Sequence, residues 1–447
     1  MAAKSHPIEH VIVLAFENRS FDHMLGCCQQ VYPQLDGIPA SHQRFNLVDR
    51  KKFWQDPGAA RTLKDDPKHE HPDVLAQLHG DNGGFVENYA RAFPALAPAD
   101  WAELIRYHDL DTLPALHTLA RNFTVCDHWF SSVPGPTWTN RLFAMTGTSL
   151  GRVKMPNGIM DLNLHWYDQP TIFDRFNEKN LSWKVYFGDF PLSFLLVHQW
   201  EPKNVCRHVP MTEFFADVAG PPENFPTFAW IEPSYLDPNA HDDHPPHDVL
   251  QGQALLGAVY NAIRAHEELW AKTLLVVFYD EHGGFYDHVE PKPTIAPDHH
   301  LDEFTFDRLG VRVPALLISP WFAADVLSKD FDHTSLLHAL QERFGLGALG
   351  ARTAQANTFW DAMLSKARTN TPQTVPLPTG VARLEDQPQK ASNPHQSTIL
   401  ALSHVLESMA GEESATVAAR SRQVLSSAQS QMDAAVDRVE AFIKNCL

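Results

Sequence analysis

Two apolar runs, far apart in the chain, are each followed directly by two side chains that carry oxygen atoms. VIVLAF precedes Glu17 and Asn18, and LLVVFY precedes Asp280 and Glu281. Runs rich in β-branched residues and leucine predict buried parallel strands, and open α/β sheets bind ligands beyond the carboxyl ends of such strands. Three carboxylates and an amide gathered there would repel one another unless a cation lay between them. The pattern predicts a divalent metal site, although either pair alone could simply begin a solvated loop.

The composition is that of a globular protein with a strongly acidic charge balance. Of the 447 residues, 44% are hydrophobic and 20% are charged, which is ordinary for a globular chain and permits a large core. The formal net charge of −18 argues against a nucleic-acid partner, because phosphate backbones are bound by clustered Lys and Arg. An acidic enzyme can still take an anionic substrate when a bound cation and imidazoles set the local potential. The 25 histidines are noteworthy for that reason.

The cysteines and the N-terminus bear on the compartment. The five cysteines are scattered and show no paired metal spacing, which favours a reducing environment. No run approaches the roughly 18 apolar residues of a membrane helix. VIVLAF is too short for a typical signal core, and the candidate ligands follow it at once. We expect a cytoplasmic protein, or a secreted one from which a leader has been removed.

The chain divides into a long α/β part and a short helical tail. Strand and helix patterns alternate over residues 1–360, which predicts a mostly parallel sheet with helices on both faces. Helices are expected from Asp332 or Thr334 to Gly345 and from Gln251 to His266. The proline-containing stretch TPQTVPLPTG predicts a linker or surface crossing over residues 361–391.

Residues 392–447 are expected to be helical. Met432, Val436, Val439 and Ile443 recur at three- and four-residue steps and give one apolar stripe. The stripe favours a helix packed on the catalytic domain, with membrane contact or oligomerisation as the alternatives.

A candidate nucleophile lies between the two carboxylate-bearing strands. In SSVPGPTWTNRLFAM, the turn PGP places Thr137 near the start of a helix, where backbone N–H groups favour an anion. A metal or base could activate its hydroxyl, and Thr139 is the competing candidate. Asn140 could donate its amide to a phosphoryl oxygen. The alternative is an ordinary helix cap.

Histidines gather in two loops. HDDHPPHDV contains His241, His244 and His247, and imidazoles there could bind a metal, donate to phosphate or protonate a leaving alkoxide. DPKHEH places His69 in a second loop. Each loop could also be merely solvated or structural.

Five strings resemble the phosphoesterase family, which contains bacterial and plant non-specific phospholipases C and related acid phosphatases within the alkaline-phosphatase-like superfamily. The resemblance covers most of residues 8–345, and the strings are ENRSFDH, TVCDHWFSSVPGPTWTNR, DDHPPHDVLQGQ, DEHGGFYDHV and LGVRVPALLISPW.

The resemblance implies a three-layer α/β/α fold and a metal-assisted hydrolase in which a hydroxyl nucleophile is transiently phosphorylated. Thr137 matches the nucleophile, and Asn140 matches an amide that contacts phosphate. His69 and His244 match histidines around the phosphate, while His247, Asp243 and His282 match less closely. The implied metal ligands are Glu17, Asn18, Thr137, Asp280 and Glu281.

These features together predict a metal-dependent phosphoric ester hydrolase that holds one divalent ion. We expect phospholipase C-type cleavage of glycerophospholipids to diacylglycerol and a phosphorylated head group, with transient contact to a membrane surface left open. His244 is the candidate acid for the leaving group. The alternatives are an acid phosphatase that acts on small monoesters and a non-catalytic binder of phospholipid head groups.

Overall fold

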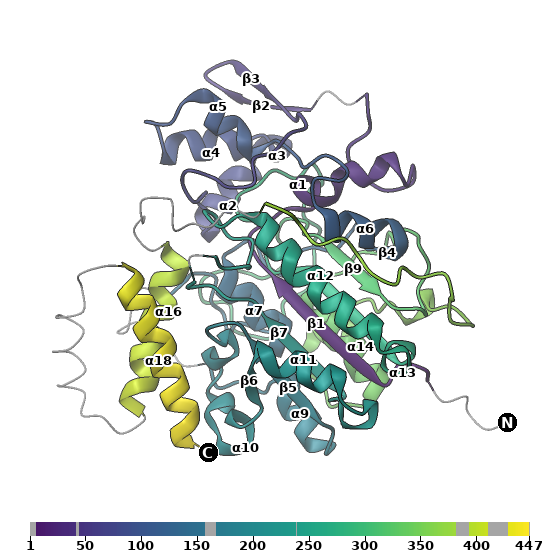
Figure 1. Ribbon diagram of the computed structural model, residues 1–447. Coiled ribbons are helices and arrows are strands. Elements are labelled where there is room, and N and C mark those ends of the chain that lie inside the picture. Colours follow the sequence, from purple (N-terminus) through teal and green to yellow (C-terminus); the bar gives the residue numbers. More distant parts are fainter. Residues whose placement is uncertain are drawn as a thin grey trace.

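A central sheet forms the body of the protein (Figure 1). The computed structural model describes residues 6–41, 44–156, 167–237, 239–380, 393–409 and 428–446. In this part of the chain the main sheet has seven strands in the order β4-β9-β8-β1-β7-β5-β6. The strands are β1 (His10–Phe16), β4 (Thr124–Val125), β5 (Trp183–Phe187), β6 (His208–Pro210), β7 (Phe228–Glu232), β8 (Thr273–Tyr279) and β9 (Ala315–Ile318).

The sheet is mostly parallel, as the sequence predicts. β1 pairs in parallel with β7 and β8, and every side chain of β1 and β8 is buried, which explains their continuous apolar sequences. The apolar residues in the string LGVRVPALLISPW form β9, which runs antiparallel to β8 and to β4. The sheet is therefore mixed at this edge. An apolar run does not encode the direction of its strand.

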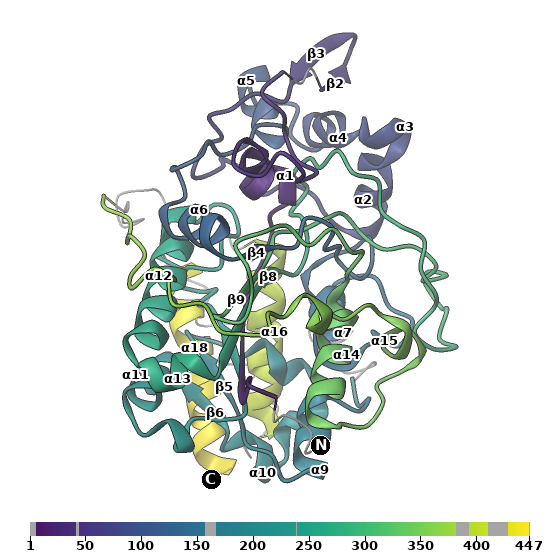
Figure 2. The same ribbon diagram turned by 90° about the vertical axis from the view of Figure 1, so that its right-hand side faces the viewer.

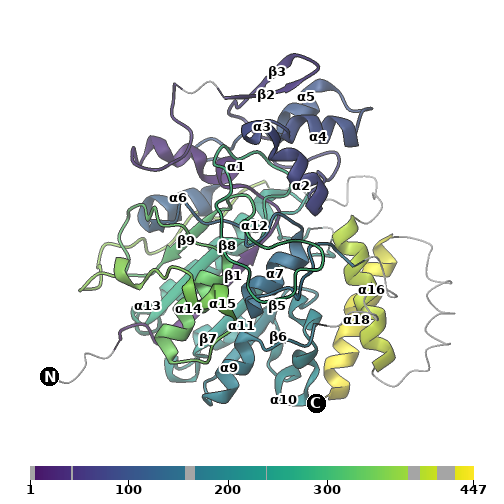
Figure 3. The ribbon, with the colours of Figure 1, turned by 180° about the vertical axis from the view of Figure 1, so that it is seen from behind.

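Helices cover both faces of the sheet and give three layers (Figure 2). One face carries α6 (Pro114–Asn122), α11 (Met211–Ala219), α12 (Val249–Ala265) and α13 (Glu267–Ala271). The other carries α7 (Thr137–Thr146), α9 (Ile172–Glu178), α14 (His333–Phe344) and α15 (Ala351–Gln355), which lie in front of the sheet in Figure 3. This arrangement confirms the three-layer α/β/α prediction.

Two helices begin and end close to where the sequence places them. α14 follows Asp332 and ends at Gly345, whose φ of 63° is the left-handed conformation that glycine adopts freely. α12 starts after Asp248, whose side chain accepts a hydrogen bond from the Leu250 backbone N–H group.

A smaller cluster of elements stands above the sheet, and we call residues 45–107 the cap region. It contains the hairpin β2 (Phe45–Val48) and β3 (Lys51–Trp54) and the helices α2 (His71–Gln77), α3 (His79–Asn82), α4 (Phe85–Ala92) and α5 (Pro98–Trp101). Its core includes Phe53, Val74 and Phe85 and reaches the loop after β8 through Phe285. The cap region is therefore packed on the segment that carries Asp280 and Glu281. The short helices α1 (Phe21–Leu25) and α10 (Pro202–Val205) are the remaining α-helices in the described part of the chain before residue 393.

In the described parts of the C-terminal tail, α16 (Pro394–Met409) and α18 (Ala428–Cys446) lie side by side (Figures 1 and 3). Met432 and Val439 are buried, and Val436 and Ile443 are partly buried against the main core. The centroids of the Phe442 and Phe194 rings are 5.6 Å apart. The apolar stripe thus packs on the catalytic part of the chain. None of the described helices is long and apolar enough to cross a membrane.

The segment between the two parts crosses α12. Pro372 accepts a hydrogen bond from the Tyr260 hydroxyl, and the Val375 N–H group donates to Asn261. The remainder of the predicted linker, residues 381–391, lies outside the described residues. The division into 1–360, 361–391 and 392–447 stays a prediction.

Candidate active site

The two pairs of oxygen-bearing residues lie side by side at the carboxyl edge of the sheet. β1 and β8 are parallel neighbours with Phe16 opposite Tyr279, so the residues that follow each strand meet. Glu17, Asn18, Asp280 and Glu281 are all fully buried, and Asn18 Nδ2 donates a 3.1 Å hydrogen bond to Glu281 Oε1.

The backbone after each strand turns sharply. Asn18 has a φ of 71°, in the left-handed region. Gly283 lies against this turn, where a Cβ atom would be only 2.2 Å from the Asn18 carbonyl oxygen. A glycine at position 283 therefore allows the DEHGG segment to approach the ENRSFD segment.

Arg141 joins this group and was not predicted from the sequence. Its Nε donates a 2.7 Å hydrogen bond to Asp280 Oδ2, and its Nη2 lies 3.5 Å from Glu17 Oε2. It comes from the second turn of α7, and it is fully buried. Nearby Tyr235, Asp280 and Glu17 raise the pKa of its guanidinium against the opposing effect of burial. Arg141 is thus a fixed cation beside two of the candidate ligands.

Thr137 is the first residue of α7, next to the turn that Pro136 ends. Its side chain is 1% exposed, and its Oγ1 has no hydrogen-bond partner among the described residues. A buried hydroxyl without a partner is costly, so Thr137 Oγ1 is available to bind a ligand.

Asn140 points elsewhere than expected. Its Nδ2 donates to the carbonyl oxygens of Gly135, Pro136 and Val133 at 2.9, 3.2 and 3.3 Å, and its Oδ1 accepts from the Val133 N–H group. The amide is fully occupied by the turn before Thr137. Asn140 therefore holds the turn in position and does not make the expected contact with phosphate. The reason is that Asn140, in the first turn of α7, folds back onto the loop that precedes the helix.

His69 and His244 lie close together, with ring centroids 5.7 Å apart. His69 Nδ1 is 2.7 Å from the Pro67 oxygen, and Nε2 is 3.5 Å from Asn18 Nδ2. Burial alone would lower the pKa of His69, but the charges of Glu281 and Asp66 raise it to about 9. Burial, together with His69 and His395, lowers the pKa of His244 well below its usual value.

The weaker candidates are held by other partners. His247 Nδ1 lies 2.7 Å from Asp242 Oδ1, and Asp243 Oδ2 accepts a hydrogen bond from the Tyr279 hydroxyl. His282 Nε2 lies 2.8 Å from Gln77 Oε1. All three residues are buried and support the loops around the site.

The oxygen atoms fit a divalent ion. Both Glu17 carboxylate oxygens and Asn18 Oδ1 are buried without a hydrogen-bond partner among the described residues. Burial and mutual repulsion raise the pKa of Glu17 well above its usual value, and burial raises the pKa of Asp280 to about 6 and that of Glu281 to about 7. Three carboxylates beside one guanidinium leave an excess of negative charge, which a divalent cation would offset.

A second acidic group does not fit an ion equally well. Asp22, Asp287 and His288 lie close enough to share one. However, Arg312 already lies 3.0 Å from Asp22 Oδ1 and 3.1 Å from Asp287 Oδ1. This guanidinium takes the place of a cation, so we assign the group to the fold.

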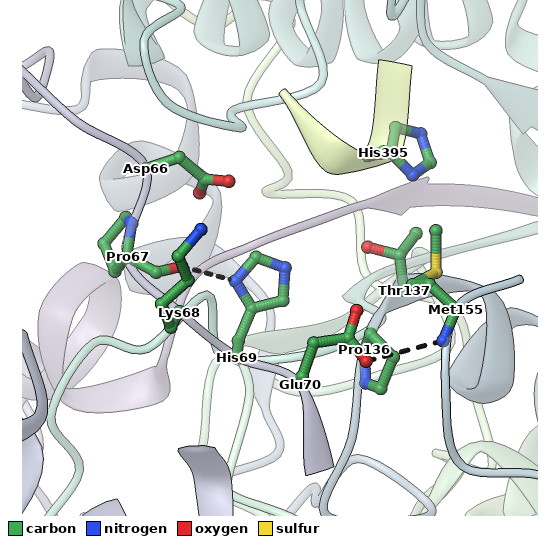
Figure 4. Close-up of a pocket in the computed structure, with 9 residues that line it drawn as sticks. All are labelled: Asp66, Pro67, Lys68, His69, Glu70, Pro136, Thr137, Met155 and His395. Carbon is green, nitrogen blue, oxygen red and sulfur yellow. Dashed lines mark hydrogen bonds between the residues drawn. The ribbon is translucent and has the colours of Figure 1, made fainter. Parts of the chain in front are cut away.

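A pocket of about 50 Å³ opens beside Thr137 (Figure 4). His69 and Asp66 lie on one side, and His395 points from the first turn of α16 on the other. His395 is 3% exposed, and its Nε2 is 3.7 Å from Glu17 Oε2. No sequence pattern predicts that His395 lies here, because it is in the tail beyond the recognised strings. Asn393 and Pro394 predict the start of a helix, but they do not indicate what its first turn contacts.

The fold and the site define a hydrolase of phosphoric esters. Comparison of the sequence with family models supports this class, since the phosphoesterase family model matches residues 8–347. The chain belongs to the phosphoesterase family.

Its curated relatives include several phospholipases C. Non-specific phospholipase C6 of Arabidopsis thaliana is 34% identical over 437 residues, which cover 90% of this chain and 81% of the relative. Non-specific phospholipase C3 of the same plant is 32% identical, over 84% of this chain and 77% of the relative. The non-hemolytic phospholipase C of Pseudomonas aeruginosa is 29% identical over 76% of this chain and 54% of its own length.

Solved structures are more distant. A protein of the alkaline phosphatase superfamily from Vibrio parahaemolyticus matches 56% of this chain and 65% of its own, at 13% identity and a TM-score of 0.34. A phosphonate monoester hydrolase of Agrobacterium radiobacter matches 58% of this chain and 74% of its own, at 10% identity and a TM-score of 0.34.

Proposed function

We propose that the protein is a divalent-metal-dependent phospholipase C that works through a phosphothreonine intermediate at Thr137. The observation that carries the proposal is the set of buried oxygens without partners, on Glu17, Asn18 and Thr137, at one edge of the sheet. The names of the relatives support the substrate class.

In this mechanism the Thr137 oxygen attacks phosphorus and the bond to the diacylglycerol oxygen breaks. Water then attacks the phosphothreonine, releases the phosphorylated head group and restores the hydroxyl. A divalent ion held by Glu17, Asn18, Thr137, Asp280 and Glu281 would lower the pKa of the hydroxyl and offset the charge on the phosphoryl oxygens.

The histidines have separate tasks. The charges of Glu281 and Asp66 favour the protonated form of His69, which can donate a hydrogen bond to a phosphoryl oxygen. The lowered pKa keeps His244 neutral when no substrate is bound. To act as the acid for the leaving group it must be protonated, and the negative charge of the bound substrate would favour that protonation.

Initial rates on three substrates test the proposal. A long-chain phospholipid, a water-soluble phosphocholine ester and a simple phosphomonoester are compared at equal metal concentration. We expect both diesters to be cleaved faster than the monoester. A preference for the monoester would establish the acid phosphatase alternative, and stoichiometric binding without turnover would establish the non-catalytic binder.

We further propose that the β2–β3 hairpin contacts the lipid surface. Phe45 lies opposite Trp54 and Leu47 opposite Lys52, so these side chains share one face of the hairpin. Leu47 and Trp54 are 48% and 38% exposed. At the tip, the exposed Arg50, Lys51 and Lys52 outnumber the exposed Asp49. This excess of positive charge on an acidic protein complements an anionic membrane. Figure 1 shows the hairpin at the outer end of the cap region.

A further inference from the structure

The first turn of α16 is fixed to the active-site loops. The Asn393 N–H group donates to Gln396 Oε1, and the Gln396 N–H group donates to Asn393 Oδ1, which together form a reciprocal cap. Gln396 Nε2 also donates a 2.9 Å hydrogen bond to the Tyr235 carbonyl oxygen, in the loop after β7. Asn393 Nδ2 lies 3.2 Å from His244 Nδ1. The helix start is therefore held on two loops of the catalytic sheet.

This turn directs His395 into the pocket beside Thr137 (Figure 4). The centroid of its ring lies 5.4 Å from that of Tyr235 and 6.1 Å from that of His244, so the imidazole packs between these two rings. Neither ring nitrogen has a hydrogen-bond partner among the described residues, although the residue is only 3% exposed. Most buried polar groups have hydrogen-bond partners, and leaving one without a partner destabilises the fold. A bound ligand would supply the missing partner.

The surroundings specify the chemistry of that ligand. The pocket is lined by Thr137, His69, Lys68 and His395, which can donate hydrogen bonds, and also by the carboxyl groups of Asp66 and Glu70. The possible donors therefore outnumber the carboxyl groups beside the hydroxyl. Donors that converge on a nucleophile suit an anion with several oxygen atoms.

We propose that His395 is a catalytic residue that donates a hydrogen bond to a phosphoryl oxygen of the substrate. The pair α16 and α18 is then part of the catalytic unit, because it carries one wall of the pocket. This inference rests on the proposed phosphoryl-transfer function, and it adds a residue from outside the segment that the family model matches.

Substitution at position 395 in the full chain tests the assignment. For His395→Ala we expect kcat/KM on a water-soluble phosphocholine ester to fall about 100-fold, as on removal of one donor to developing charge. The Kd for inorganic phosphate should rise about tenfold. His395→Gln, which keeps an N–H donor of similar reach, should recover about tenfold of the lost kcat/KM. The control is His404→Ala, further along the same helix and paired with Glu407, which should stay within about twofold of wild type.

Two further measurements make the result decisive. Elemental analysis should find unchanged metal content in His395→Ala, whereas loss of metal would overturn the proposal in favour of a metal ligand. Unaltered kcat/KM and phosphate affinity in folded His395→Ala would also overturn it. If the wild type cleaved no ester but bound phosphate in a His395-dependent way, the proposed function would fail while the contact would stand.

Discussion

Arg141 Nε and Asp280 Oδ2 lie 2.7 Å apart, and they join the second turn of α7 to the end of β8. Both side chains are fully buried, so neither charge is solvated. Arg141 therefore neutralises part of the negative charge of the carboxylates, and a metal ion would have to neutralise the rest. It also connects the helix that begins at Thr137 to the candidate metal ligands.

Loss of the Arg141 charge should make the protein depend on metal for its stability. Removing one partner from a buried ion pair commonly costs about 3–5 kcal/mol, and Arg141→Met should lower the free energy of unfolding of metal-stripped protein by about that amount. Added divalent cation should recover part of the loss. Urea unfolding with and without metal measures it, and Arg141→Lys, which keeps the charge, is the matched control. Equal stability of Arg141→Met and wild type without metal would contradict the electrostatic role.

Thr137 should be indispensable for turnover. Thr137→Val keeps the shape but removes the nucleophile, so kcat should fall at least about 10³-fold, while Thr137→Ser should stay within about tenfold. Mass spectrometry of acid-quenched wild type during turnover should find a phosphoryl group on Thr137. Thr139→Val is the control; if it, and not Thr137→Val, abolished activity, the nucleophile would be Thr139.

Removal of the metal should abolish activity reversibly. Prolonged dialysis against a chelator should lower kcat at least about 100-fold, because the charge of the transition state loses its main stabilisation. Elemental analysis of active protein should find about one divalent ion per chain, and Glu281→Gln should reduce that occupancy. Full activity in chelated protein with no detectable metal would contradict this prediction.

The free energy of unfolding should fall in alkaline solution through His288. His288 Nδ1 lies 2.8 Å from Asp22 Oδ2, and its Nε2 lies 2.9 Å from Asp36 Oδ1. Burial alone would lower its pKa, but these carboxylates raise it to about 9. Because folding raises the pKa of His288, the protonated side chain stabilises the folded state. This stabilisation is fully present below the pKa of about 6.5 in the unfolded chain, and it is lost as the pH rises through about 9.

Urea unfolding between pH 6 and pH 10 tests this relationship. Wild type should lose up to about 3 kcal/mol over that range, and His288→Gln should lose much less because it cannot release the proton. The exposed His299 provides a control, since His299→Gln should behave as wild type. Parallel profiles for wild type and His288→Gln would contradict the assignment.

The hairpin face should govern binding to vesicles and leave the chemistry unchanged. Leu47→Ser combined with Trp54→Ser should reduce co-sedimentation with vesicles that contain phosphatidylglycerol about tenfold, since both side chains lose apolar contact. Lys51→Glu combined with Lys52→Glu should weaken binding most at low salt. Rates on a soluble ester should not change. Phe215→Ser, which alters another exposed apolar side chain, is the control, and equal binding by all variants would contradict the proposal.

Local patterns in the sequence were sufficient to predict the strands β1 and β8 and the meeting of Glu17, Asn18, Asp280 and Glu281. Parallel neighbours deliver their following residues to one edge, so two apolar runs were enough. The direction of β9 was not predictable in this way, because a buried strand has the same composition in either orientation.

The misplaced and missed residues have a different cause. Asn140 and Arg141 are consecutive residues of α7, and the rotation of the helix directs the first toward the PGP turn and the second toward Asp280. Sequence spacing does not fix that rotation. His395 reaches the pocket through tertiary packing of a tail helix, for which the sequence offered only a cap signal.

The central position of β1 has a consequence for synthesis on the ribosome. This strand emerges first, yet its partners β7 and β8 begin only at Phe228 and Thr273. Both hydrogen-bonding edges of VIVLAF therefore stay open while most of the catalytic part is translated, and such edges invite pairing with other chains. Because of this topology, β1 has to be protected from pairing with other chains during translation.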